Sequence, residues 1–177
     1  MGATVNLLIY LLKVVYMKYI IQPKLLTIFT LILLSGSVFS HENETDKEAK
    51  STMFTGLETS AGKTVLAFHE ALETGDAQTA RGLLADDVLI LEGKGVERSA
   101  QEYASHHMLS DMKYLKAMTI ESIEHHVTQF DVVAISISRS SVKGTYKDKN
   151  IDRIGNETIT LKKHDDKWKI THIHWSN

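Results

Sequence analysis

The sequence predicts an α+β protein, with helices first and an antiparallel sheet last. Residues 60–118 carry apolar side chains at helical spacing, interrupted by one short strand pattern. Residues 119–176 then show four strand patterns separated by short turns, and strands joined in this way pair antiparallel. Helices that precede such a run of strands pack on the sheet as a separate layer. The roughly 120 residues involved can supply an ordinary core, which the chain needs because it has no cysteine for disulfides.

Three helices are expected before the run of strands. Their start and stop signals are Ser60 and Gly75 for the first, Asp76 for the second, and the capping-box pair Ser99 and Glu102 for the third, which runs to about Met118. One strand, Val88–Glu92, is expected between the second and third helices. The later strands are predicted at Thr119–Thr128, Asp131–Lys147, Ile151–Lys163 and Lys167–Ser176, with turns at 129–130, 148–150 and 165–166.

The N-terminal part of the chain predicts a secretory signal peptide. From Met17 on, two lysines form a positive region, residues 25–34 an apolar stretch and residues 35–40 a small-residue region. We expect cleavage before His41 and treat residues 1–16 as an extension upstream of a start at Met17. The predicted protein is therefore exported, either periplasmic or secreted.

An uncleaved membrane anchor is the alternative, because apolar residues extend back to Val5. Three lysines and Pro23 interrupt this longer run, and a bilayer span needs about 20 mostly apolar residues. Contact with a membrane is expected only through this segment. Residues 41–59 are polar and lack periodicity, so they predict a flexible linker before a domain at 60–177.

Charge argues against nucleic acid as a partner. The whole chain has a formal net charge of −2, and all 22 of its acidic residues follow position 40, where 17 lysines and arginines remain, giving −5. A nucleic-acid-binding domain presents a basic surface instead. We expect a small-molecule ligand, no nucleic acid and no cofactor.

The third helix carries a charged group on its core-facing side. Asp111 projects into an apolar stripe made by Ala104, Met108, Met112, Leu115 and Met118. Burying a carboxylate without a partner costs several kcal/mol. His107 lies one turn earlier and is the expected partner of Asp111, with a backbone amide or an arginine as the alternative. Tyr103 lies beside His107, and His106 is expected to face solvent.

The last strand places two histidines two positions apart. In a regular strand, His172 and His174 share one face with Trp168, and we expect both imidazoles to face the same space as Asp111. A β-bulge near Thr171 is the alternative and would place the histidines differently. A hollow is also indicated by the small-residue face of an earlier strand, formed by Ala134, Ser136 and Ser138.

Three segments give the chain a family resemblance: EYASHHMLSDMKYL in the third helix, ETITLKK in a late strand and HIHWS at the end. Together with the order of elements, they resemble the SnoaL-like bacterial branch of the nuclear transport factor 2-like superfamily, over residues 60–177. The resemblance implies a cone-shaped, curved antiparallel sheet wrapped around three N-terminal helices, with a pocket at its wide end. Its implied pocket residues are His107, Asp111, Glu157, His172 and His174, with Glu92 at the border.

Four functions fit these residues. Binding of a small molecule in a preformed pocket is favoured. Proton-transfer catalysis of the isomerase, dehydratase or cyclase type would use His107 or His172 as base, oriented by Asp111 or Glu157. A zinc or copper site could use His107, His172 and His174. In the fourth, a polar network only joins helix to sheet. Whether the chain is an enzyme stays open.

Two sets of candidate residues follow. The candidate catalytic residues are His107, Asp111, His172 and His174, and the candidate ligand-binding residues are Glu92, Tyr103, Glu157 and Trp168. Because the superfamily commonly pairs through the outer face of its sheet, the resemblance also implies a homodimer. Ile173 and Trp175 are expected on that outer face. A dimeric interaction domain without enzymatic activity is the opposing class of function.

Overall fold

The computed structural model describes residues 52–177. The predicted signal peptide and the predicted linker up to residue 51 lie outside the described residues. Within 52–177, no helix is long and apolar enough to cross a membrane. The first element, β1 (Phe54–Thr55), lies inside the segment predicted as a linker and pairs in parallel with β4 (Met118–Phe130).

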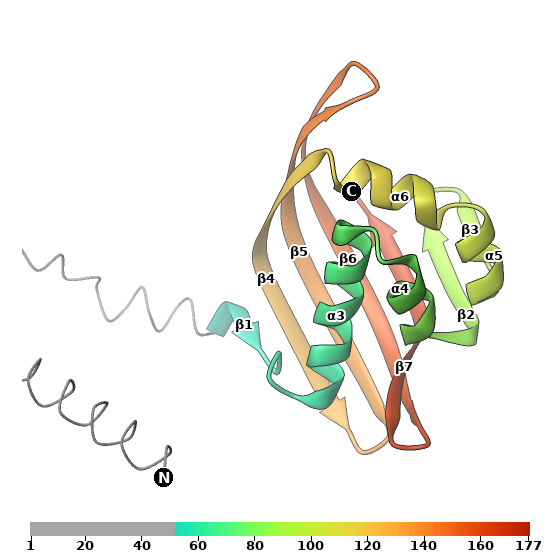
Figure 1. Ribbon diagram of the computed structural model, residues 1–177. Helices are drawn as coiled ribbons and strands as arrows, with labels where there is room; N and C mark the ends of the chain where they lie inside the picture. Colours follow the sequence, from blue (N-terminus) through green and yellow to red (C-terminus); the bar gives the residue numbers. More distant parts are fainter. Residues whose placement is uncertain (1–51) are drawn as a thin grey trace, which may run out of the picture. The chain divides into compact units, whose positions relative to one another are not determined.

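The described residues form a curved sheet with helices on one side of it (Figure 1). The helices are α3 (Ser60–Thr74), α4 (Ala77–Leu83), α5 (Ala100–Ser105) and α6 (Met108–Leu115). The other strands are β2 (Leu84–Glu92), β3 (Gly95–Glu97), β5 (Val133–Tyr146), β6 (Lys149–His164) and β7 (Lys167–Ser176). The predicted α+β class is confirmed.

The strands lie in the order β1-β4-β5-β6-β7-β2-β3. Neighbouring strands are antiparallel except at two pairings, β1 with β4 and β2 with β7, which are parallel. Because β2 joins β7 at the far side of the sheet from β4, the chain brings its first long strand next to its last. The C-terminal strand β7 is therefore an interior strand of the sheet, paired with β6 on one side and with β2 on the other.

Helix α3 begins and ends on specific side-chain and backbone signals. Its N-cap is Thr59, one residue before the predicted Ser60, and the Thr59 hydroxyl accepts from the Gly62 N–H at 3.0 Å. Its C-cap is Gly75, as predicted, in the left-handed conformation with φ 84°. The left-handed conformation at Gly75 ends α3 and leads the chain into α4.

The predicted third helix is interrupted. It starts as predicted, since the Ser99 hydroxyl accepts from the Glu102 N–H at 3.0 Å. The helix then breaks at His106 and His107, which form the turn between α5 and α6. The prediction of one continuous helix is wrong, because the contact of His107 with Glu97 on β3 draws the chain out of helical geometry.

The hairpin turns lie close to the predicted positions. The turn between β6 and β7 is Asp165–Asp166, as predicted, and both residues have positive φ. The other two turns differ, with residues 131–132 joining β4 to β5 and Lys147–Asp148 joining β5 to β6. Two consecutive positive φ values fit the type I′ turn, whose twist matches that of the flanking strands.

A β-bulge in β7 overturns the expected side-chain alternation. Ile170 pairs with Leu161 and His172 pairs with Thr160, so Thr171 has no partner of its own across the strands. The prediction that Trp168, His172 and His174 share one face is wrong, because the extra residue reverses the faces after Thr171. Ile170 and Ile173 are both fully buried as a result.

The core lies between the helices and the inner face of the sheet. Large side chains with at most 1 % exposure come from every layer, and they are Phe68, Tyr103, Met108, Ile159, Leu161, Ile170 and Ile173. The inner face of β5 contributes three small buried side chains, Ala134, Ser136 and Ser138. Small residues at this position leave room that larger ones would fill.

Candidate functional site

A cavity of about 520 Å³ lies between the helices and the inner face of the sheet. Its walls come from α3, α6, β4, β5, β6 and the ends of β2 and β7. Apolar groups such as Leu72, Leu115 and Ile120 line part of it, and titratable groups line the rest. A mostly apolar hollow with a few polar groups is the usual form of a small-molecule site.

The first polar group of the cavity is a histidine–glutamate pair. His69 Nε2 on α3 lies 2.9 and 3.0 Å from the two carboxylate oxygens of Glu157 on β6. The Ser138 hydroxyl donates to Oε1 of Glu157 at 3.2 Å, and the Trp175 indole N–H donates to Oε2 at 2.7 Å. Three donors therefore hold the Glu157 carboxylate, which is 11 % exposed against 27 % for His69.

Strand register explains how these groups meet. Glu157 is paired with Ser138 on β5 and with Trp175 on β7, so the three side chains lie side by side on the inner face. Trp175 reaches this face only because of the bulge at Thr171. His69 reaches the same carboxylate from α3, where it directly follows the buried Phe68.

The pair shifts both pKa values in a way that favours charge. Burial alone would raise the pKa of Glu157, but the His69 charge and the bonds from His69 and Trp175 hold it below its ordinary value. Burial alone would lower the pKa of His69, but the Glu157 carboxylate beside it raises the pKa above 6.5. The pair therefore favours an imidazolium and a carboxylate inside the pocket wall.

The second polar group of the cavity is Asp111 on α6. The Tyr103 hydroxyl donates to its Oδ2 at 3.0 Å. Burial, together with the negative charge of Glu92, raises the pKa of Asp111 to about 6, against the opposing effects of Tyr103 and His107. Burial and the Asp111 charge also raise the pKa of Tyr103, which stays a protonated donor. Asp111 can thus gain or lose a proton close to neutral pH.

Trp175 lies between the two groups. Its indole N–H binds Glu157, and its ring centroid is 6.2 Å from that of Tyr103. Tyr103 itself borders a smaller cavity of about 200 Å³, which also touches Glu92 and Trp175. The predicted ligand-binding residues Glu92 and Glu157 line the larger cavity, whereas Tyr103 acts on it through Asp111.

None of the three predicted histidines is hydrogen-bonded to Asp111. His107 contacts Oε1 of Glu97 rather than Asp111, so the expected pairing within one helix is wrong. His172 donates to the Leu89 carbonyl at 2.8 Å, on the side of the sheet where Leu89 is 39 % exposed. His174 borders the cavity but is solvent exposed.

Trp168 also lies away from the cavity, in the core. It is 6 % exposed, and its indole N–H donates to the Ser60 hydroxyl at 2.8 Å. Its role in this structure is to tie β7 to the start of α3. Trp168 was predicted as a ligand-binding residue, and it does not line the larger cavity.

His69 is absent from the candidate residues predicted from the sequence. The available signal was its position between Phe68 and Leu72 on the apolar face of α3. A buried histidine, His125, lies 5.9 Å from His69 between ring centroids and shares a 2.8 Å hydrogen bond with Ser136. Burial lowers the pKa of His125 to about 4, so it is neutral at physiological pH.

The comparisons with known proteins assign the family. The model of the SnoaL-like domain matches residues 62–177. The chain belongs to the SnoaL-like domain family. The comparison with curated proteins gave no match.

Solved structures of this SnoaL-like protein's relatives agree with the fold. A "putative ketosteroid isomerase" from Shewanella frigidimarina is 49% identical, with a TM-score of 0.66, over 68% of this chain and 98% of that chain. A "putative dehydratase" of the NTF2-like family from Streptomyces avermitilis is 20% identical, with a TM-score of 0.56, over 65% and 91% of the two chains. The association domain of C. elegans CaMKII is 12% identical, with a TM-score of 0.54, over 76% and 100%. The last two show the fold alone.

Proposed function

We propose that this SnoaL-like protein binds a small molecule in the larger cavity and transfers a proton on it. The observation that carries this proposal is that two carboxylates with oppositely shifted pKa values, Asp111 and Glu157, line one cavity. Asp111, with its pKa raised to about 6, and the His69–Glu157 pair line the same walls. Titratable groups whose pKa values are pushed in different directions are typical of acid–base sites.

Asp111 is the proposed proton acceptor. At pH 7 it is mostly ionised, yet its raised pKa makes it a stronger base than an ordinary aspartate. It would remove a proton from carbon beside a carbonyl group or beside a carbon bearing a hydroxyl. Returning that proton to another atom of the same molecule gives isomerisation, and loss of the hydroxyl as water gives dehydration.

The His69–Glu157 pair is the proposed partner of the ligand's polar end. An imidazolium stabilises negative charge that develops on a carbonyl oxygen while the base removes the proton. Glu157 holds His69 in its charged form and in place, and Ser138 and Trp175 hold Glu157. The apolar walls would exclude water and take up the carbon skeleton.

The name of one structural relative, a putative ketosteroid isomerase that is 49% identical, is consistent with this chemistry, because isomerisation moves a proton near an oxygen-bearing carbon. Simple binding without turnover is the second candidate. It is favoured by the Tyr103 hydroxyl, which is occupied by Asp111 rather than turned toward a ligand.

The test uses the purified protein with a β,γ-unsaturated cyclic ketone, followed by the absorbance of the conjugated product. Asp111→Asn should lower kcat/KM by about 100-fold or more, the size typical of losing a general base. His164→Ala, which alters an exposed histidine far from the cavity, should leave it unchanged.

Ligand binding to the wild type and to Asp111→Asn is measured in parallel from the change in tryptophan fluorescence. Trp175 lines the cavity and should respond to the ligand, whereas Trp168 lies in the core and should contribute the same background in both proteins. Binding that is retained in Asp111→Asn without turnover supports the role of Asp111 as base. Turnover unaffected by Asp111→Asn contradicts the proposal, and binding without turnover in the wild type favours the binding-only function.

A further inference from the structure

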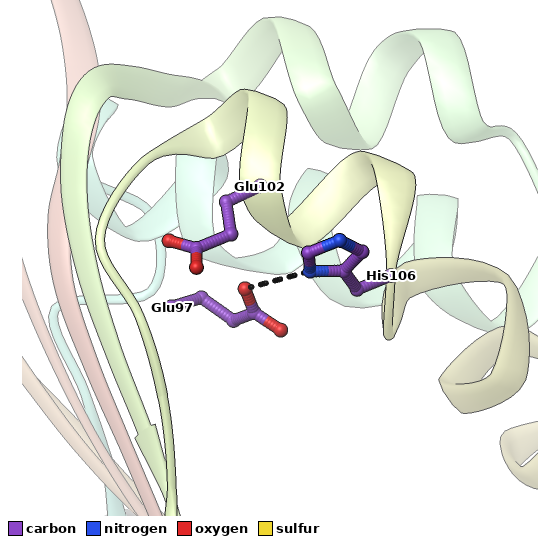
Figure 2. A group of neighbouring side chains, drawn as sticks. All are labelled: Glu97, Glu102 and His106. Carbon is purple, nitrogen blue, oxygen red and sulfur yellow. Dashed lines mark ion pairs between the residues drawn. The ribbon is translucent and has the colours of Figure 1, made fainter.

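We propose that Glu97, Glu102 and His106 form a zinc site on the surface of the domain, at the turn between α5 and α6. One ligand atom from each residue can be chosen so that all three lie within 4.8 Å of one another. Figure 2 shows the Glu97 carboxylate between Glu102 and the His106 ring. The site is separate from the larger cavity, and it does not rest on the proposed function.

A buried oxygen without a hydrogen bond points to a missing ligand. The Glu97 side chain is only 6% exposed, and its Oε2 is buried with no hydrogen-bond partner. Leaving a buried carboxylate oxygen unsatisfied is costly, and native proteins rarely do so. A cation at this oxygen would remove that cost.

The spacing of Glu97 and His106 fits two ligands of one ion. His106 Nδ1 lies 3.6 Å from Glu97 Oε2, which is longer than a hydrogen bond. Two ligand atoms bound at about 2.0–2.1 Å to a tetrahedral ion lie about 3.3 Å apart. A small movement of the exposed His106 ring would bring both atoms into contact with one Zn²⁺.

The surrounding residues support the ligands. His107 contacts the other carboxylate oxygen of Glu97, Oε1, which leaves Oε2 directed toward His106. Glu102 Oε2 accepts from the Arg98 N–H at 2.6 Å, so its carboxylate is held at the start of α5. Bonds of this kind orient the ligating groups of metal sites.

The chemistry of the ligands selects zinc among common divalent cations. Two carboxylates and one imidazole, with water as the fourth ligand, balance the charge of Zn²⁺. Mg²⁺ and Ca²⁺ prefer oxygen ligands throughout and more of them. The ion would fasten the break between α5 and α6 to β3, in addition to the contact of His107 with Glu97.

The test titrates ZnCl2 into the full chain, expressed without a histidine tag, and follows heat and melting temperature. One ion should bind per chain and raise the melting temperature. Co²⁺ in place of Zn²⁺ should give the visible absorption of a tetrahedral site. His106→Ala and Glu102→Gln should abolish both signals, and His107→Ala should weaken binding about 10- to 100-fold.

The variants are chosen to preserve the fold. His106 is exposed, and glutamine can replace Glu102 in a capping box. His164→Ala, another exposed histidine beside a carboxylate, is the matched control and should bind zinc like the wild type. The zinc site is overturned if no heat is seen, if binding survives His106→Ala, if His172→Ala abolishes it, or if only Ca²⁺ or Mg²⁺ binds.

Discussion

Two carboxylates in one cavity differ because their neighbours differ. Glu157 accepts bonds from three side chains and faces a cationic partner, so it remains ionised despite burial. Burial and the negative charge of Glu92 raise the pKa of Asp111, and its single bond, from a neutral tyrosine, does not offset them. Both carboxylates lose solvent, so the number of hydrogen bonds and the sign of the nearest charge decide which of them stays ionised.

Removing the charge of Asp111 is expected to stabilise the protein at neutral pH. Because its pKa is raised from 3.8 to about 6, the folded state favours the protonated form, and stability is lost as pH rises through 6. Asp111→Asn should gain about 1 kcal/mol at pH 7.5, after discounting for partial exposure. Chemical denaturation at several pH values measures this.

The gain should vanish below pH 3.8, where the wild-type carboxyl is also neutral in both states. Asp87→Asn, at an exposed position of β2, is the control and should change stability by less than about 0.5 kcal/mol at every pH. A loss of stability in Asp111→Asn at pH 7.5 would contradict the raised pKa.

Breaking the His69–Glu157 pair should destabilise the fold strongly. Glu157→Ala leaves His69 without its partner and frees two donors, which costs about 3 kcal/mol. Glu124→Ala removes a more exposed partner of His126 and Arg139 and should cost at most about 1 kcal/mol. Equal losses of unfolding free energy in the two variants would show that the His69–Glu157 pair stabilises the fold no more than an exposed ion pair does.

The pair also predicts a pH window. The raised pKa of His69 gives stability that is complete below 6.5 and is lost as pH rises through the folded value. The lowered pKa of Glu157 gives stability that is complete above 4.5 and is lost as pH falls. The difference between the wild type and His69→Gln should therefore be largest between pH 4.5 and 6.5.

At the scale of elements, the bulge at Thr171 decides which side chains of β7 face the cavity. Deleting Thr171 would restore regular alternation and move the inward residues outward. Ile173 and Trp175 would then lose their places in the core and beside Glu157. We expect the deletion to abolish cooperative unfolding, as measured by circular dichroism.

Deleting one residue can also fail for reasons unrelated to register. Thr171→Val, which keeps the chain length but removes the hydroxyl bonded to Thr160, is the control. It should cost about 1 kcal/mol and leave a folded protein. A stable, cooperatively folded deletion variant would contradict the importance of the bulge.

Much of the element pattern follows from local signals in the sequence. Gly75, Ser99 and the pair at 165–166 act through their own neighbours, so their roles were predictable. The break at His106–His107 and the bulge at Thr171 depend on contacts with the separate strands β3 and β6, and not on the periodicity of the element itself. The expected alternation of side chains assumes an unbroken strand, and for this reason it predicts that His172 and His174 face the same space as Asp111.

The site was predicted only in part for the same reason. Asp111 is predictable because a charged residue within an apolar helical stripe stands out, whereas Glu157 is implied only by the family resemblance. His69 was missed because a histidine beside an apolar stripe is common in structural positions. Its partner, Glu157, lies 88 residues later, and only the fold brings the two together.

At the scale of the whole molecule, the exposed side of the sheet is apolar on β5. Val133, Ile135 and Ile137 are 42 %, 36 % and 52 % exposed. Ile173 and Trp175, expected on this side, instead face the interior because of the bulge. We propose that this β5 surface, rather than Ile173 and Trp175, pairs two copies of the chain.

Ile137→Lys should therefore shift the protein from dimer to monomer, which sedimentation velocity measures. Ile137 is more than half exposed, so the substitution should leave the monomer folded. Leu109→Lys changes a 65 % exposed residue on α6, outside this surface, and should leave the dimer intact. A wild type that sediments as a monomer at all concentrations would exclude the pairing.

The most direct measurement of the central claim is a 13C NMR titration of the Asp111 carboxyl and the His69 ring in the intact protein. The cavity proposed as an acid–base site requires a midpoint near 6 for Asp111 and above 6.5 for His69. Both should shift when a ketone ligand is added. An Asp111 midpoint near 3.8, unchanged by ligand, would contradict the proposed site.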